Sequence, residues 1–339
     1  MNRARRIAAF AVTVAAAFAT SAAPAAAKAT EPTMPATDGP AKAPFKVMPL
    51  GDSITYGHGS SSGFPGTGPS QATGYRTRLV TELRAAGLNV DFVGSLQDGP
   101  AHTDRDHEGH RGWRIDQIAA HIDGWLTRYR PDAILLNIGV NDLALRFDVP
   151  NAPARLSALI DQIRKDLPTA DIFVQKLVPG HIEPYVSLIN AYNAKIPAIV
   201  AGKDSKVHLV DQSTIPGIGL YDQTHPNDFG YAQMTYNLYQ AMKAVYDTAG
   251  TWPVVADPKK AATASMGFRV YKSRGVSTAV YYTYTRRLVS GTTYSWQRPA
   301  PTRQTYRVRV KGRYETRTRT VVRWVADDPY LTAYRKFFG

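Results

Sequence analysis

The sequence predicts an α/β fold followed by a smaller β-rich region. From about residue 45 to 248, short apolar runs alternate with segments whose apolar residues recur at helical spacing. Residues 132–138 are predominantly apolar, as in a strand covered on both faces. Alternating strands and helices indicate a five-stranded parallel sheet between helical layers, a three-layer domain with flavodoxin-like strand order. Beyond residue 266, Tyr, Thr, Val and Arg alternate as in short antiparallel strands.

The elements of the α/β domain, residues 45–248, follow one another in order. The expected strands are residues 45–50, 90–94, 132–138, 172–178 and 207–210. The expected helices are residues 74–86, 115–129, 156–167, 188–200 and 227–245. Gly87 ends the first helix because glycine tolerates the left-handed backbone found there. Asn227 or Asp228 can cap the last helix, and Pro197 predicts a kink in the one before it.

The C-terminal region is expected to be a separate basic β-rich domain, residues 267–339, after a linker at residues 249–266. Its expected strands are residues 268–271, 278–288, 293–296, 305–311 and 314–324. Lys311-Gly312 predicts a tight hairpin turn between the last two strands.

The N-terminus has the pattern of an export signal. Three arginines lie within residues 1–6, residues 7–19 are apolar, and Ala25-Ala26-Ala27 offers a cleavage site of small residues. We therefore expect a signal peptide at residues 1–27, a flexible Ala/Pro-rich lead-in at residues 28–44, and a secreted protein without a membrane span. Arg5-Arg6 leaves twin-arginine export open beside the general route. The absence of cysteine excludes thiolate catalysis and thiolate metal sites.

A Gly-Asp-Ser turn after the first predicted strand places the Ser53 hydroxyl at the carboxyl end of the sheet, where α/β proteins bind their ligands. A serine nucleophile needs an imidazole to take its proton and a carboxylate to orient that imidazole. His225 and Asp222 supply both, because a carboxylate three residues before a histidine can reach Nδ1. Asp104 and His107 have the same spacing but lie in a segment predicted as a polar loop, so we favour the later pair.

Four short blocks follow the order and rough spacing seen in the SGNH (GDSL-type) hydrolases, which the chain resembles over about residues 45–248. They are Gly51-Asp52-Ser53, a lone Gly112, Gly139-Val140-Asn141-Asp142, and Asp222 with His225. Residues 48–55, 74–76, 92–95 and 107–110 are most similar to carbohydrate esterase family 3, the branch that includes acetylxylan esterases.

This resemblance implies a secreted serine esterase that hydrolyses O-acyl, foremost O-acetyl, esters of carbohydrate without a cofactor. The same blocks fit a lipase or phospholipase of the superfamily, which stays open as the alternative. A function of another class is a cell-wall or polyanion-binding protein with a vestigial hydrolase domain. The presence of a residue at every catalytic position argues against that interpretation.

The tetrahedral intermediate of ester hydrolysis carries a negative oxygen that needs preorganised N–H donors. The backbones of Ser53 and Gly112 and the side-chain amide of Asn141 are expected to supply them. A turn glycine and a loop amide are the alternative interpretations of Gly112 and Asn141. Asp52 and Asp142 are expected to support the surrounding loops and not to react.

Two further residues are expected near the site. Arg76, carried over from the resemblance at Gly74-Tyr75-Arg76, is expected to shape its edge, with a solvated helix arginine as the alternative. Trp113 is expected to line the substrate cleft, because aromatic faces stack on sugar rings. Residues 102–110 are rich in His, Asp and Glu but lack the His-Glu-x-x-His spacing of zinc proteases. We therefore expect no metal site, with a divalent ion in this segment as the minor alternative.

The formal net charge of +14 is concentrated at one end of the chain. From residue 259 onward, 18 Lys and Arg stand against 3 Asp and Glu. Such a surface is expected to hold the protein on an anionic cell-wall polymer or polysaccharide. An arginine-rich outer face without a partner is the alternative. The sequence carries no recognisable nucleic-acid-binding motif, so no nucleic-acid partner is expected.

Overall fold

The computed structural model describes residues 43–60, 72–180, 184–215, 219–222, 224–260, 263–272, 275–291 and 293–325. The predicted signal peptide lies outside the described residues, as does the lead-in up to residue 42. None of the helices in the described ranges combines the length and the apolar character that crossing a membrane requires.

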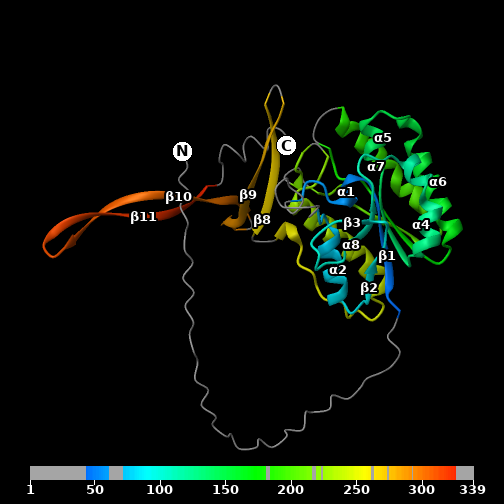
Figure 1. Cartoon of the computed structure of the whole chain (residues 1–339), viewed down its shortest axis with the longest axis horizontal. Helices are drawn as coiled ribbons and strands as arrows, with labels where there is room; N and C mark the ends of the chain where they lie inside the picture. Colours follow the sequence, from blue (N-terminus) through cyan, green and yellow to red (C-terminus); the bar gives the residue numbers. More distant parts are fainter. Residues whose placement is uncertain are drawn as a thin grey trace, which may run out of the picture. The chain divides into compact units, whose positions relative to one another are not determined.

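Five parallel strands form the centre of the α/β region (Figure 1). They are β1 (Phe45–Gly51), β2 (Val90–Phe92), β5 (Ala133–Asn137), β6 (Asp171–Gln175) and β7 (Val207–Val210). Their order is β2-β1-β5-β6-β7, with every neighbouring pair parallel. The predicted strands and their flavodoxin-like order are therefore confirmed. All five residues of β5 and of β6 are buried, which explains the apolar runs at residues 133–136 and 172–174 within them.

Two short strands, β3 (Leu96–Gln97) and β4 (Asp106–Gly109), extend this sheet to seven strands. β4 runs parallel to the end of β1, and β3 pairs antiparallel with β4. The prediction of a polar loop here was wrong. Polar residues usually indicate an exposed loop, but His107 and Glu108 are fully buried. Each has a hydrogen-bond partner inside the protein, which makes its burial possible.

Helices cover both faces of the sheet (Figure 1). They are α1 (Ser53–Tyr56), α2 (Arg76–Ala85), α3 (Ile115–Ala119), α4 (Ile122–Tyr129), α5 (Val140–Ala144), η2 (Val149–Asn151), α6 (Ala152–Asp166), α7 (Tyr185–Ala201) and α8 (Asp228–Tyr246). α2 packs against α8 on one face, and α3, α4 and α7 pack against α6 on the other.

The structure refines two of the helix predictions. The single helix expected at residues 115–129 is two helices, α3 and α4, separated by a turn at residues 120–121, although both bury the same apolar stripe. Asn227 caps α8, and its side chain accepts hydrogen bonds from the backbone N–H groups of Phe229 and Gly230. That cap fixes where α8 begins, directly after His225 and Pro226.

The C-terminal region forms a four-stranded antiparallel sheet in the order β11-β10-β9-β8, preceded by η4 (Pro258–Lys260). The strands are β8 (Thr263–Lys272), β9 (Gly275–Ser290), β10 (Thr293–Val310) and β11 (Arg313–Val325). Five short strands were expected and four long ones are found. Lys311 and Gly312 both have positive φ, as the predicted hairpin turn requires.

β10 changes partner along its length. Within the described residues, β10 pairs with β9 at residues 293–297 and with β11 at residues 298–310. Among the described strands, the second half of β10 therefore has a neighbour on one side only, and such edge strands are where prolines like Pro299 and Pro301 are tolerated. These prolines made one strand look like two in the sequence. We call residues 298–325 the arginine hairpin; no side chain described within it is buried.

The first residues of the segment predicted as a linker pack against the α/β region. Trp252 and Val255 are buried in the main core, each 7% exposed. Tyr239 Oη donates a hydrogen bond to the carbonyl of Pro253, and Lys243 Nζ donates one to the carbonyl of Trp252. These contacts fix residues 252–255 against α8.

Candidate active site

The turn from β1 into α1 holds Ser53 at the carboxyl end of the central strand. A Cβ on Gly51 would lie 2.0 Å from the carbonyl oxygen of Asn137, so only glycine allows β1 and β5 to approach this closely. Asp52 caps α1 by accepting a hydrogen bond from the N–H of Ile54 at 2.9 Å. Ser53, 7% exposed, is then the first residue of the helix.

The structure brings Ser53 and His225 together across 172 positions of sequence. Ser53 Oγ lies 2.8 Å from His225 Nε2, and His225 Nδ1 lies 2.9 Å from both oxygens of Asp222. A carboxylate on this side holds the proton on Nδ1 and leaves Nε2 to accept a proton from the serine.

The loop that carries Asp222 and His225 is closed by backbone hydrogen bonds just before α8. Tyr221 N–H donates to the carbonyl of His225 at 2.8 Å, and Asn227 N–H donates to that of Gly219 at 2.8 Å. The Asn227 side chain also donates to the carbonyl of Leu220. The loop therefore holds acid and imidazole at a fixed separation.

The environment of Asp222 keeps it ionised. Burial alone would raise the pKa of Asp222, but the His225 charge outweighs this, together with hydrogen bonds from the His225 ring and from the N–H groups of His225 and Thr224. The pKa of Asp222 is therefore held well below its ordinary value, and the carboxylate stays charged over the whole range in which imidazole titrates.

Hydrogen bonds join the segments that carry the three expected oxyanion donors. His110 N–H donates to the carbonyl of Gly51 at 2.8 Å, which ties the turn at residues 110–113 to the end of β1. Asn141 Nδ2 donates to the carbonyl of Trp113 at 2.8 Å, which ties the same turn to α5. One of the two amide hydrogens of Asn141 is used in this way, and the second is left for another acceptor.

Gly112 lies within that turn, which is closed by a hydrogen bond from Trp113 N–H to the carbonyl of His110 at 3.1 Å. Its φ of +80° requires glycine, and a Cβ there would meet nothing within 4 Å. Backbone conformation selects glycine here, and open space lies beside it.

Asp142 and Asp52 are both fully buried. Asp142 accepts hydrogen bonds from the N–H of Ile115 at 3.0 Å and from Arg155 at 2.8 Å, so it links α5 to the start of α3. Burial raises the pKa of Asp142. Burial also raises the pKa of Asp52 to about 7, and its Oδ2 has no hydrogen-bond partner within the described residues.

Arg76 is fully buried, so the alternative of a solvated helix arginine was wrong. Its guanidinium donates to five carbonyl groups, those of Thr55, Tyr56, Ala72, Asp98 and Arg105. Two of these carbonyls belong to α1, so Arg76 anchors the helix that begins at Ser53. Burial lowers the pKa of Arg76 to about 10, which leaves it charged at neutral pH.

Trp113 is half-buried and belongs to an aromatic stack. Its ring lies 4.2 Å from the ring of His110, which in turn lies 4.7 Å from that of Trp125. Both tryptophans also pack against the main core. One face of the Trp113 ring thus packs against His110. Trp113 is also the residue that directly follows Gly112.

The rival pair and the acidic segment around it have other partners. Asp104 accepts from Arg84 and from the N–H of Phe92, and it does not join His107. His107 bonds to Asp98, and its Nδ1 accepts from the N–H of Gly109. Burial, followed by the charge of Arg76, lowers the pKa of His107 to about 4. Within the described residues, the segment 102–110 contains no group of side chains close enough to share a metal ion.

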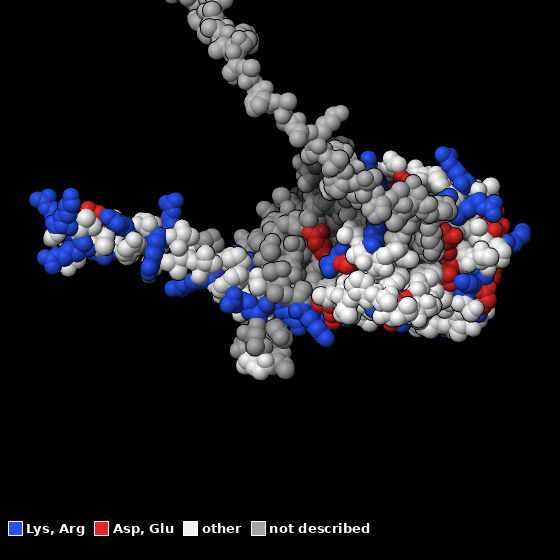
Figure 2. Space-filling view, turned by 90° about the horizontal axis from the view of Figure 1, so that it is seen from below, with Lys and Arg blue, Asp and Glu red and all other residues white. Residues whose placement is uncertain are grey.

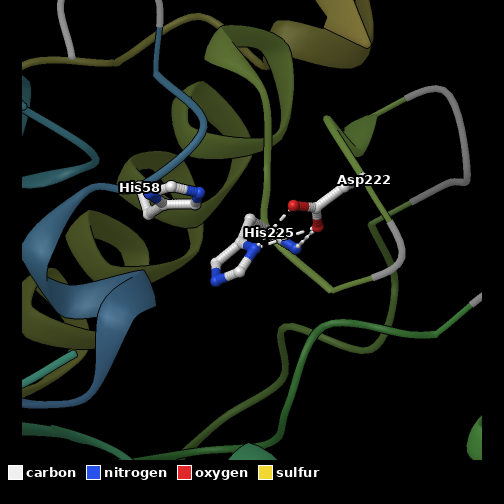
Figure 3. A group of neighbouring side chains, drawn as sticks. All are labelled: His58, Asp222 and His225. Carbon is white, nitrogen blue, oxygen red and sulfur yellow. Dashed lines mark hydrogen bonds and ion pairs between the residues drawn. The ribbon is translucent and has the colours of Figure 1, made fainter. Parts of the chain in front are cut away.

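His58 also lies at the site, although the sequence pattern did not predict it there. Its ring centroid lies 4.4 Å from that of His225 in an edge-to-face arrangement, on the chain directly after α1 (Figure 3). The only signal in the sequence was its place in Gly57-His58-Gly59, five residues after the serine. Both glycines have positive φ, +99° and +92°, which turns the chain back toward the histidine loop.

The α/β region is similar to known proteins. Residues 50–233 match the GDSL-like Lipase/Acylhydrolase family. A family 3 carbohydrate esterase of Clostridium thermocellum is 38% identical, with a TM-score of 0.52 over 60% of this chain and 98% of that one. A carbohydrate esterase family 3 structure from Talaromyces cellulolyticus is 26% identical, with a TM-score of 0.51 over 60% of this chain and 99% of that one.

A multidomain esterase of Ruminococcus flavefaciens is 29% identical over 229 residues, 56% of this chain. The chain spans 27% and 56% of the lengths of the curated relatives it matches. The family match extends over more than half of this chain and includes all four blocks of the predicted resemblance, which is thereby confirmed. The protein belongs to the GDSL-like lipase/acylhydrolase family.

Proposed function

We propose that the protein is a secreted serine esterase that hydrolyses O-acyl, foremost O-acetyl, esters of carbohydrate. The observation that carries the proposal is the continuous chain of contacts from Ser53 Oγ to His225 Nε2 at 2.8 Å and from His225 Nδ1 to Asp222 at 2.9 Å. Its secretion rests on the export pattern of residues 1–27.

The chemistry is a two-step acyl transfer. His225 Nε2 takes the proton of Ser53 as Oγ bonds to the ester carbonyl carbon, and the carbonyl oxygen becomes negative. The N–H groups of Ser53 and Gly112 and the Asn141 amide donate to that oxygen. The intermediate collapses when His225 gives its proton to the leaving alcohol. A water molecule, deprotonated by His225, then bonds to the acyl carbon; the bond from that carbon to Ser53 Oγ breaks, Oγ takes the proton back from His225, and the acid is released.

Carbohydrate is the favoured alcohol component for two reasons. The solved relatives that are 38% and 26% identical are both described as family 3 carbohydrate esterases. Trp113 also follows Gly112 directly and presents a ring whose other face is supported by His110. A half-buried indole at this place suits a pyranose ring.

We further propose that the arginine hairpin binds an anionic polymer at the cell surface. Residues 298–325 contain nine Lys and Arg and one Glu, and these basic side chains gather along the hairpin (Figure 2). Strand alternation places arginines on both faces, with Arg303, Arg307 and Arg309 on one and Arg313, Arg317 and Arg319 on the other.

The test is hydrolysis by purified Ser53→Ala against a panel of acetyl esters, long-chain nitrophenyl esters and acetylated oligosaccharides. The variant is expected to lose at least about 10⁴-fold in kcat, and Ser157→Ala on α6 serves as the matched control. Preference of the wild type for acetylated sugars supports the proposal. Preference for long acyl chains would make it a lipase, and retained hydrolysis by Ser53→Ala would refute the mechanism.

A further inference from the structure

Three side chains beside the serine converge on one another. A ring nitrogen of His58, an oxygen of Asp222 and a ring nitrogen of His225 all lie within 4.8 Å of each other (Figure 3). No other group of this kind is found within the part of the chain that the structure describes. Asp222 is buried and the two histidines are half-buried, so an ion could reach them from solvent.

His58 is held in place by the backbone around it. Tyr231 Oη donates a hydrogen bond to the His58 carbonyl at 2.6 Å. A Cβ on the next residue, Gly59, would lie 2.5 Å from the carbonyl oxygen of Pro226, so this segment is packed directly against the histidine loop. The position of His58 beside His225 is therefore set by the fold.

The donor set selects a class of ion. Two imidazoles and one carboxylate suit zinc and its neighbours among the transition metals, whereas calcium and magnesium require mostly oxygen ligands. Ligand atoms around a four-coordinate zinc lie about 3.3 Å apart. The Asp222 and His225 atoms are 2.9 Å apart and the His58 nitrogen lies within 4.8 Å of both, so the His58 ring moves toward them to complete the set.

We propose that His58, Asp222 and His225 form a site for a divalent transition-metal ion such as zinc, and that occupation of this site switches the esterase off. The second half of this proposal rests on the proposed function, in which His225 is the base. The first half does not depend on it.

Inhibition is expected because a metal ion and the catalytic proton transfer would compete for the imidazole of His225. An ion on Nδ1 needs the lone pair of that nitrogen, so the ring proton moves to Nε2, which can then no longer accept the proton of Ser53. The Asp222 carboxylate is drawn to the metal at the same time, and the serine loses its base.

The first experiment measures binding by calorimetry, with zinc chloride titrated into the full-length protein. The wild type is expected to bind one zinc ion. His58→Phe keeps a ring against His225 but removes both nitrogens, so its affinity should fall at least about tenfold, the loss that even an outer partner of a metal ligand can cause. His102→Phe, an exposed histidine elsewhere, is the matched control, and His58→Gln is a second variant should the first fail to fold. Calcium chloride is expected to give no binding.

The second experiment measures ester hydrolysis against zinc concentration, with each variant compared with its own metal-free rate. Zinc should inhibit the wild type and His102→Phe alike, a chelator should restore both, and His58→Phe should need at least about tenfold more zinc. Equal zinc affinity in wild type and His58→Phe would overturn the site. Ser53→Ala should still bind zinc, so hydrolysis by that variant would refute the proposed function and leave the metal site standing.

Discussion

The α/β region and the arginine hairpin use charged residues in opposite ways. In the α/β region, Arg76, Glu108 and Asp142 are fully buried and every one of them has defined partners. In the hairpin, arginines such as Arg303, Arg307 and Arg317 are exposed. A buried charge can orient a reacting group because it has one arrangement, whereas an exposed ribbon can only present side chains to a partner.

The hairpin is held by pairing across its two strands. The guanidinium of Arg319 donates to Gln304 Oε1 at 2.9 Å and lies over the ring of Tyr306, and Arg307 lies over the ring of Tyr314. Each such exposed contact contributes about 0.5–1 kcal/mol. Two strands without a core are only marginally stable, so a surface that binds the hairpin would stabilise it.

The largest expected difference between the regions is in catalysis. Asp222→Asn should lower kcat about 10⁴-fold, because an amide no longer holds the His225 proton on Nδ1. Hydrolysis of nitrophenyl acetate measures this, with an unchanged circular dichroism spectrum as the check on folding. Asp104→Asn, in the rival pair, is the control; if it loses more activity than Asp222→Asn, the assignment of the acid is wrong.

Stability gives the next contrast. Phe173 in β6 is fully buried, so Phe173→Ala should lower the free energy of unfolding by about 3–5 kcal/mol. Trp324→Ala, in the hairpin, should change it by less than about 1 kcal/mol, since Trp324 is 42% exposed and lies outside the core. Urea denaturation followed by circular dichroism measures both. A large loss in Trp324→Ala would show that the hairpin packs more tightly than its exposure indicates.

Binding to polyanions should depend on the arginine hairpin and not on the α/β region. Replacing three hairpin arginines with glutamine should weaken binding to a polyphosphate or acidic polysaccharide roughly tenfold at low salt and leave nitrophenyl acetate hydrolysis unchanged. The positions are Arg303, Arg307 and Arg317. The control makes the same charge change on the α/β surface, at Arg78, Arg128 and Arg146. Equal weakening in both triple variants would mean that net charge alone governs binding.

The smallest expected effect is a pH dependence of stability. Burial raises the pKa of Asp52 from 3.8 to about 7, so between these values the folded state binds more protons than the unfolded state. Stability contributed by this group is therefore lost as pH rises through that window. Asp52→Asn does not titrate, and its melting temperature relative to wild type should rise by a few degrees between about pH 4 and pH 8.

Glu315→Gln in the hairpin is the matched control for this prediction. Its side chain is 50% exposed, and the melting temperature should not change at either pH. A constant difference between Asp52→Asn and wild type over the same range would show that Asp52 is not buried as a neutral acid.

The spacing of apolar residues and the residue composition were enough to predict a large part of the fold. The five parallel strands follow from short apolar runs such as residues 132–138, since a strand covered on both faces must be apolar throughout. Ser53, Asp222 and His225 could be chosen because their residue types and spacing match one chemistry. β3 and β4 could not be predicted, because the burial of His107 and Glu108 depends on partners at Asp98 and Ser95.

The sequence by itself determined which residues can do the chemistry, because reactivity belongs to residue type and local spacing. Only the tertiary structure decided which of them meet. It separated Asp104 from His107, buried Arg76 beneath α1, and set His58 against His225, because each of these outcomes depends on contacts between segments far apart in the chain.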